Sequence, residues 1–196
     1  MKDIIDEVIN ECREFANDHR VGYNEGGTKG VRNRVEDDAA QRLFGEVSMI
    51  KPKVILEVGT GWGYSALWMA KAAVEYGGRI ITIDFGSEAT MKANEFFIKA
   101  GVSNIVTALN GDARQLIPAL KAYKFDMIIL DAEKTMYKEF IELAEPMMSQ
   151  GTVILSDNVI DRAADMKDFL DYVRTDGKYK STLIETEDGL ERTVRL

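Results

Sequence analysis

The fold is decided by residues 57–65, which read Glu57-Val58-Gly59-Thr60-Gly61-Trp62-Gly63-Tyr64-Ser65. The stretch follows an apolar run at 54–56 and leads into a helical pattern that starts at Ser65. Glycine has no Cβ, so this turn lets the backbone approach a ligand closely, and the first helical turn offers unpaired N–H groups. A buried strand, a glycine turn and a helix start together predict a cofactor site; a purely structural turn is the alternative.

The spacing of the three glycines distinguishes this turn from the dinucleotide-binding fingerprint, G-x-G-x-x-G. Gly59, Gly61 and Gly63 are closer together, and Tyr64 stands where the fingerprint has its third glycine. The form E-x-G-x-G-x-G is instead similar to the first motif of class I methyltransferases that use S-adenosylmethionine. This resemblance implies that the turn, with Glu57 before it, binds that cofactor.

Composition excludes several kinds of protein. The 196 residues, 45% of them hydrophobic, are enough for one domain with a sizeable core. No run approaches the roughly 20 apolar residues that span a membrane, and the acidic segment 2–7 is unlike a secretion signal. We therefore expect a cytoplasmic protein that does not bind membranes.

Cysteine and histidine each occur once, as Cys12 and His19. A single cysteine excludes an internal disulfide and a cysteine metal cluster. With a single histidine, we expect neither a poly-histidine metal site nor a serine–histidine or cysteine–histidine triad. The chemistry must come from other residue types.

The net charge of −8 disfavours non-specific binding to polyanions, which depends on neutralising phosphates. A small basic cluster near the N-terminus is the exception, formed by Lys29, Arg32, Arg34 and Arg42. A solvated helix face explains it best, but it leaves a nucleic-acid partner, such as tRNA, open.

Apolar runs and helical patterns alternate along most of the chain. Strands are predicted at 53–58, 79–84, 104–109, 125–131, 151–156, 179–186 and 190–195. Helices are predicted at 3–17, 35–49, 65–76, 87–100, 113–121, 136–148 and 164–174. We therefore predict one α/β domain over 1–196: a doubly wound, Rossmann-like, mostly parallel seven-stranded sheet with a C-terminal antiparallel hairpin and a helical N-terminal extension over 1–50.

In such a sheet, ligands bind at the carboxyl ends of the strands. The second strand ends at Asp84, where a carboxylate can accept hydrogen bonds from both ribose hydroxyls of a nucleoside; capping the next helix is the alternative. The third strand is followed by Asn110-Gly111-Asp112-Ala113, a capped helix start that can also face an adenine.

The fourth strand ends at Asp131 and the fifth at Asp157-Asn158. Two close carboxylates repel each other unless a proton or a cation lies between them. Together with an amide oxygen they form an all-oxygen site suited to Mg²⁺, Mn²⁺ or Ca²⁺. Spacing alone leaves a second interpretation open, in which both aspartates only cap the helices that follow.

Four separated motifs resemble the cation-dependent O-methyltransferases, the group of catechol O-methyltransferase and caffeoyl-CoA O-methyltransferase. They are Gly63-Tyr64-Ser65, Asp131-Ala132-Glu133-Lys134-x-x-Tyr137, Ser156-Asp157-Asn158-Val159 and Asp188-Gly189-Leu190-Glu191. The resemblance runs from about Tyr23 to the C-terminus with the family's order and spacing.

The resemblance implies a role for each matching residue. Asp131, Asp157 and Asn158 would hold Mg²⁺, and Lys134 would be the general base. S-adenosylmethionine would be bound by Glu57, Gly59, Gly61, Gly63, Tyr64, Ser65, Asp84, Gly111, Asp112, Ala113 and Asp131. Tyr23, Asn24 and Lys29 fall in loop 21–34, where the family has its substrate and cofactor loop, and a homodimer is possible.

The expected reaction is Mg²⁺-dependent methyl transfer from S-adenosylmethionine to a hydroxyl of a catechol-like phenol with vicinal oxygens. A cation beside Lys134 would lower the pKa of that lysine, so that it can accept a proton. Ala132 and Glu133 replace the aromatic residues of catechol enzymes, and Thr182 replaces an acidic one, which leaves the acceptor open. The alternatives are methylation of a hydroxylated tRNA base and a non-catalytic protein that binds the cofactor.

Overall fold

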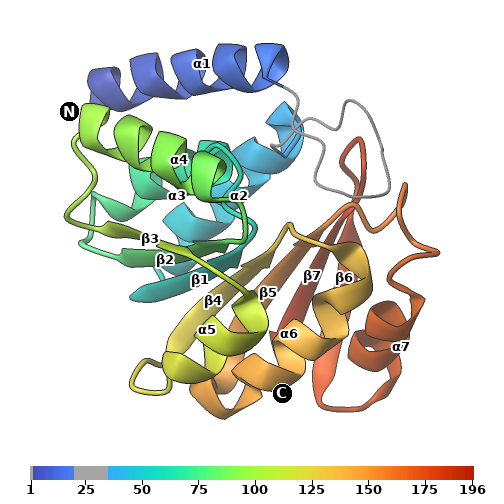
Figure 1. Ribbon diagram of the computed structural model, residues 1–196. Helices are drawn as coiled ribbons and strands as arrows, with labels where there is room; N and C mark the ends of the chain where they lie inside the picture. Colours follow the sequence, from blue (N-terminus) through green and yellow to red (C-terminus); the bar gives the residue numbers. More distant parts are fainter. Residues whose placement is uncertain (1, 20–34) are drawn as a thin grey trace.

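The computed structural model describes residues 2–19 and 35–196. One sheet of seven strands runs through the molecule, and helices cover both of its faces (Figure 1). Helices α1 to α4 pack on one face, and α5, α6 and α7 pack on the other. The predicted α/β architecture is therefore confirmed.

The N-terminal half contains α1 (Lys2–Asp18), α2 (Asp37–Ile50), β1 (Val54–Val58), α3 (Tyr64–Ala73), β2 (Arg79–Asp84), α4 (Ser87–Lys99) and β3 (Val106–Asn110). The C-terminal half contains α5 (Ala113–Ala119), β4 (Phe125–Leu130), η1 (Lys134–Met136), α6 (Tyr137–Ala144), η2 (Glu145–Met147), β5 (Met148–Asp157), α7 (Lys167–Thr175), β6 (Tyr179–Ile184) and β7 (Leu190–Arg195). The two η elements are single turns of 3₁₀-helix.

The strand order is β3-β2-β1-β4-β5-β7-β6. Strands β1 to β5 are parallel, and β7 is antiparallel to both β5 and β6. The chain moves outward from β1 to β3 and then returns to β4 on the other side of β1. This reversal places the ends of β1 and β4 at the position where doubly wound sheets bind ligands.

Each central strand is buried on both faces, which explains its unbroken apolar sequence. In β1, Ile55 belongs to the core under α1 to α4, whereas the next residue, Leu56, belongs to the core under α5 to α7. Neighbouring residues of a strand point to opposite faces, so both cores need apolar residues from the same short run. The sheet is thereby packed between two helical layers.

The predicted helix at 136–148 is wrong at its C-terminal end. Helix α6 ends at Ala144, a 3₁₀ turn follows, and β5 already begins at Met148. Pro146 has no N–H to continue the helical hydrogen bonds, and it stands at the start of the 3₁₀ turn. Strand β5 is therefore longer than the predicted 151–156.

Within the described ranges 2–19 and 35–196, no helix is both long enough and apolar enough to cross a membrane.

Candidate active site at the strand ends

The glycine turn after β1 is tied to the ends of both neighbouring strands. Gly59 N–H donates to the carbonyl oxygen of Ile83 in β2 at 2.8 Å, and Asp131 N–H donates to that of Val58 at 2.9 Å. Gly59 has φ +103°, and a Cβ there would lie 1.9 Å from the carbonyl oxygen of Asp131. The turn can reach the end of β4 only because residue 59 is glycine.

Side chains in the second half of the turn point into the core. The Trp62 ring is buried, and its Nε1–H donates to the carbonyl oxygen of His19 at 3.1 Å. The Tyr64 hydroxyl donates to Asp37 of α2 at 2.7 Å. Gly63 lies against α4, where a Cβ would meet the Phe97 ring at 2.9 Å. These side chains anchor the turn, so a ligand would meet mainly its backbone.

Glu57 is fully buried beneath the turn. Its Oε1 accepts from the Ser65 hydroxyl at 2.5 Å, whereas Oε2 has no hydrogen-bond partner among the described residues. Burial raises the pKa of Glu57 to about 8. An unpartnered buried acceptor is costly, so this oxygen is suited to a donor or a cation brought by a ligand.

Asp84 links the glycine turn to the end of β2. One carboxylate oxygen accepts from Gly61 N–H at 2.7 Å, and the other accepts from Gly86 N–H at 2.8 Å. Gly86 is the N-cap residue of α4, so this second bond holds the loop that leads into the helix. Because each carboxylate oxygen has more than one lone pair, these bonds do not preclude ribose binding.

The end of β3 lies beside the end of β2. Gly111 N–H donates to the carbonyl oxygen of Asp84 at 2.9 Å. Asp112 caps α5 by accepting from Arg114 N–H at 2.9 Å, and Ala113 is buried at the first helical position. The predicted capped helix start is confirmed here, while the adenine contact stays a prediction.

Asp131 and Asp157 follow paired residues of adjacent strands. Leu130 of β4 pairs with Ser156 of β5, and the two aspartates are the next residues along. Asp157 is 4% exposed, and its Oδ1 has no hydrogen-bond partner within the described chain. Burial, and then the Asp131 carboxylate, raise the pKa of Asp157 to about 8. Two such carboxylates favour a proton or a cation between them.

Asn158 follows with φ +67°, a left-handed conformation that asparagine tolerates better than most residues. Its amide Nδ2 donates to Asp188 Oδ2 at 3.4 Å. The described residues hold no group of three or more His, Cys, Asp or Glu side chains placed to bind a metal. The predicted set differs from such a group, because it combines two carboxylates with one amide.

Lys134 is buried beside Asp131. Its Nζ donates to Asp131 Oδ1 at 2.8 Å and to the Tyr137 hydroxyl at 2.8 Å. Burial lowers the pKa of Lys134, but Asp131 and Tyr137 outweigh burial and leave that pKa above its ordinary value. The predicted lowering of the Lys134 pKa depends on a neighbouring cation. Without that cation, the surrounding residues raise this pKa and keep Lys134 as an ammonium.

Tyr137 and Asp188 lie in the family-like motifs, but the sequence assigns neither residue an individual role. The Tyr137 hydroxyl accepts from Lys134 and donates to the Leu130 carbonyl at 2.8 Å, so it fixes the lysine against the end of β4. Its position three residues after Lys134 on a helical turn was a usable signal. The contact of Asp188 with Asn158 had no local signal, because 30 residues separate the two.

Part of the predicted site lies outside the described residues. Tyr23, Asn24, Lys29 and the rest of loop 21–34 belong to this part, as do Arg32 and Arg34 of the basic cluster. Arg42 is described, on the exposed side of α2.

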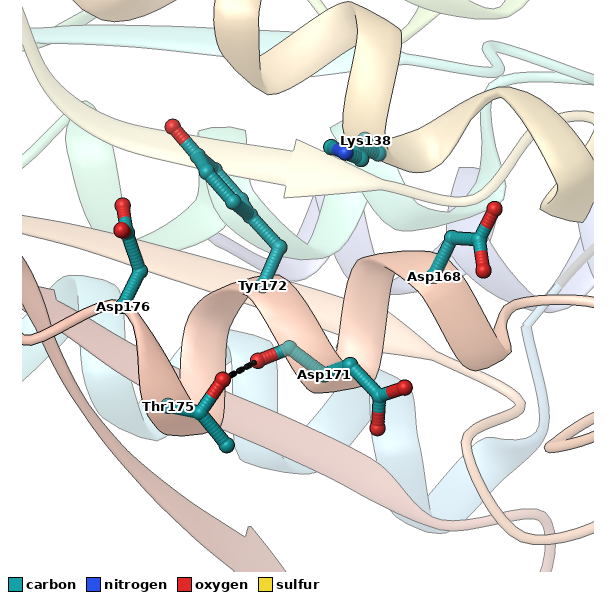
Figure 2. Close-up of a pocket in the computed structure, with 6 residues that line it drawn as sticks. All are labelled: Lys138, Asp168, Asp171, Tyr172, Thr175 and Asp176. Carbon is teal, nitrogen blue, oxygen red and sulfur yellow. Dashed lines mark hydrogen bonds between the residues drawn. The ribbon is translucent and has the colours of Figure 1, made fainter.

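A surface hollow lies elsewhere, between α6 and α7 (Figure 2). It is lined by Lys138, Asp168, Asp171, Tyr172, Thr175 and Asp176. The Thr175 hydroxyl donates to the backbone carbonyl of Asp171, which is an ordinary contact within α7. No strand-end residue lines this hollow, and Asp171 is paired with Lys167, as on a solvated helix face.

Sequence comparison connects this geometry with known proteins. The sequence profile of the O-methyltransferase family matches residues 12–189. Catechol O-methyltransferase B of Danio rerio is 33% identical over 96% of this chain and 72% of its own length. Catechol O-methyltransferase of Bos taurus is 35% identical over 74% of this chain and 57% of its own length. The chain thus spans just over half of the bovine protein.

Structural comparison agrees on the fold. The O-methyltransferase from Bacillus cereus, solved in complex with SAH, has a TM-score of 0.81 over 99% of this chain and 91% of its own. At 22% identity, this likeness concerns the fold alone.

Proposed function

Because this chain belongs to the O-methyltransferase family, we propose that it moves a methyl group from S-adenosylmethionine to one hydroxyl of a catechol-like phenol, and that the reaction requires Mg²⁺. The names of the fish and cattle relatives support the substrate class. The strand-end residues support the chemistry.

The observation that carries the metal requirement is the unpartnered oxygen of Asp157. This buried carboxylate stands beside Asp131 and has one oxygen without a hydrogen-bond partner in the described chain. Asn158 adds an amide at the same strand end. Carboxylate and amide oxygens are the ligands that Mg²⁺ prefers, so the residues present fit the ion.

The turn after β1 fits S-adenosylmethionine equally well. Gly59 brings the backbone of the turn against the end of β4, and Glu57 offers a buried acceptor oxygen. Asp84 stands at the neighbouring strand end to accept hydroxyl hydrogen bonds. When bound, the cofactor supplies a methyl group on a positively charged sulfur, which is open to attack by a phenolate oxygen.

Asp131, Asp157 and Asn158 would hold a divalent cation, which would help to orient the substrate and would lower the pKa of the attacking hydroxyl. Lys134 is the residue placed to receive the hydroxyl proton. In the free protein its Nζ already carries a proton, held there by Asp131 at 2.8 Å. Lys134 must therefore release that proton to solvent before it can act as a base, and neutralising the Asp131 charge would lower the pKa of Lys134.

Methyl transfer tests the proposal directly. Labelled S-adenosylmethionine is incubated with vicinal diphenols and with matched monophenols, with Mg²⁺ or with a chelator. We expect transfer to the diphenols only, lost with chelator and lost in Asp157→Asn. Asp168→Asn, an exposed carboxylate on α7, is the control and should behave as wild type. Chelator-resistant transfer, or transfer by Asp157→Asn at the wild-type rate, would refute the metal requirement.

A further inference from the structure

The segment after β5 rests on the turn that joins β6 to β7. Val159 N–H donates to the Gly189 carbonyl at 3.1 Å, and Ile160 N–H donates to the Asp188 carbonyl at 2.9 Å. The Asn158 side chain adds a third bond, from Nδ2 to Asp188 Oδ2 at 3.4 Å. Three hydrogen bonds therefore join residues that are 28 to 30 positions apart.

Gly189 permits this close approach. Its φ is +81°, and a Cβ there would lie 2.4 Å from Cγ1 of Ile160 and 2.9 Å from the Ile160 backbone nitrogen. A larger residue would push the two segments apart. The β6–β7 turn is thus built to lie against the segment that carries Asn158.

The side-chain bond has a chemical consequence. An asparagine side chain ends in one oxygen and one NH₂ group, and only the oxygen can bind a cation. A carboxylate that accepts from the NH₂ group favours the rotamer in which the oxygen faces the other way. We propose that Asp188 is a positioning residue that orients the Asn158 amide, so that its oxygen is presented to the divalent cation. This inference rests on the proposed function, because it takes Asn158 as a metal ligand.

A general attraction by negative charge is the competing explanation. Asp161, Glu36, Glu187 and Asp38 act electrostatically on Asp188, so this region would attract any cation. Glu187 is the matched control, because it is exposed and adjacent to Asp188. Its backbone N–H donates to Asp38 at 2.8 Å, and this bond survives substitution of the side chain.

Direct metal binding separates the two explanations. Mn²⁺ is titrated into the full, cofactor-free chain, and free Mn²⁺ is followed by its paramagnetic resonance signal. Residues that hydrogen-bond to metal ligands and orient them typically contribute about 10–100-fold to the metal affinity. We expect a loss of that size for Asp188→Ala and a much smaller loss for Glu187→Ala. S-adenosylhomocysteine affinity should stay unchanged in both, whereas a merely structural defect would weaken it as well.

A double-mutant cycle tests the orientation itself. Replacing Asn158→Asp gives a side chain with two equivalent oxygens, which needs no orientation. In this background, Asp188→Ala should cost no more Mn²⁺ affinity than Glu187→Ala does. If Asp188→Ala does not fold, Asp188→Ser provides the same comparison with a polar residue in the turn.

Two results would overturn the inference. Equal losses for Asp188→Ala and Glu187→Ala in the native background, with Mn²⁺ binding that still depends on Asp157, would overturn the orienting role alone. Absence of Mn²⁺ binding, or binding that is unaffected by Asp157→Asn, would overturn the proposed metal requirement together with it.

Discussion

Gly59 and Asp131 approach so closely that a Cβ on Gly59 would lie 1.9 Å from the Asp131 carbonyl oxygen. Gly59 belongs to the turn that fits the cofactor, and Asp131 is the first carboxylate of the candidate metal site. The same close contact therefore sets the distance between the two sites. Methyl transfer depends on such alignment, because the acceptor oxygen must lie in line with the methyl group.

Gly59→Ala should consequently damage both sites. The residue has φ +103° and no space for a Cβ, so the end of β4 must shift. We expect a loss of more than about 3 kcal/mol in the free energy of unfolding, with at least about tenfold weaker binding of both S-adenosylhomocysteine and Mn²⁺. Chemical denaturation measures the free energy of unfolding, and direct titration measures the two affinities.

Gly77→Ala is the matched control. Gly77 also has a positive φ, +77°, but a Cβ there would meet nothing within 4 Å. Only the backbone penalty of about 1–2 kcal/mol remains, and ligand affinities should not change. Equal effects of the two substitutions would show that the contact with Asp131 is unimportant.

Glu57→Gln should change how stability depends on pH. The folded protein raises the pKa of Glu57 from 4.5 to about 8, so the native state binds this proton more tightly than the unfolded state does. Stability from this group is complete below about pH 4.5 and is lost as the pH rises through about 8. Glutamine removes the group, so the variant should gain up to about 1.4 kcal/mol per pH unit relative to wild type across that window.

Denaturation of the ligand-free protein between about pH 5 and pH 9 measures this difference. Glu139→Gln, on the exposed side of α6, is the control and should track wild type. A Glu57→Gln curve parallel to wild type would mean that Glu57 is ionised throughout.

The fold and the strand-end residues were predictable because the governing patterns are local. Apolar runs identified the parallel strands, and parallel strands bring their carboxyl ends to one edge of the sheet. Asp131 and Asp157 could therefore be predicted at the same edge of the sheet, and the register of β4 and β5 makes them neighbours. The glycine turn could be predicted equally well, because only glycine permits such close contacts.

Contacts between distant segments could not be predicted in this way. Trp62 and Tyr64 belong to the glycine turn, but their side chains are held by His19 and by Asp37 of α2, far away in sequence. The charge state of Lys134 likewise depends on its burial against Asp131 and Tyr137, which no spacing reveals. Such properties arise from packing, and they decide which atoms of a motif a ligand meets.

Lys134→Met should act oppositely on metal binding and on methyl transfer. The ammonium donates to Asp131 at 2.8 Å and so competes with a cation for that carboxylate. Its removal should raise Mn²⁺ affinity, while loss of a general base lowers the transfer rate by about 100-fold or more. Titration of Mn²⁺ and single-turnover methyl transfer provide the two readouts.

Lys138→Met, on α6, provides the control for Lys134→Met. The Lys138 side chain is 43% exposed and pairs only loosely with Glu142, at 3.9 Å. Neither Mn²⁺ affinity nor transfer should change in this variant. A fall in Mn²⁺ affinity with Lys134→Met would mean that the lysine supports the metal site instead of competing for it.

Asp157→Asn should make the free protein more stable and abolish its response to Mg²⁺. In the free protein, burial and Asp131 raise the pKa of Asp157 from 3.8 to about 8, so ionisation of this buried carboxyl destabilises the fold as the pH rises through that range. The stability that the variant gains over wild type should therefore be small near pH 4 and largest above about pH 8.

Saturation with Mg²⁺ at 100 times its Kd should stabilise wild type by about 2.7 kcal/mol and leave the variant unchanged. Denaturation with and without Mg²⁺ measures both effects, with Asp168→Asn as the exposed-carboxylate control. A wild type that Mg²⁺ does not stabilise would contradict the proposed metal site.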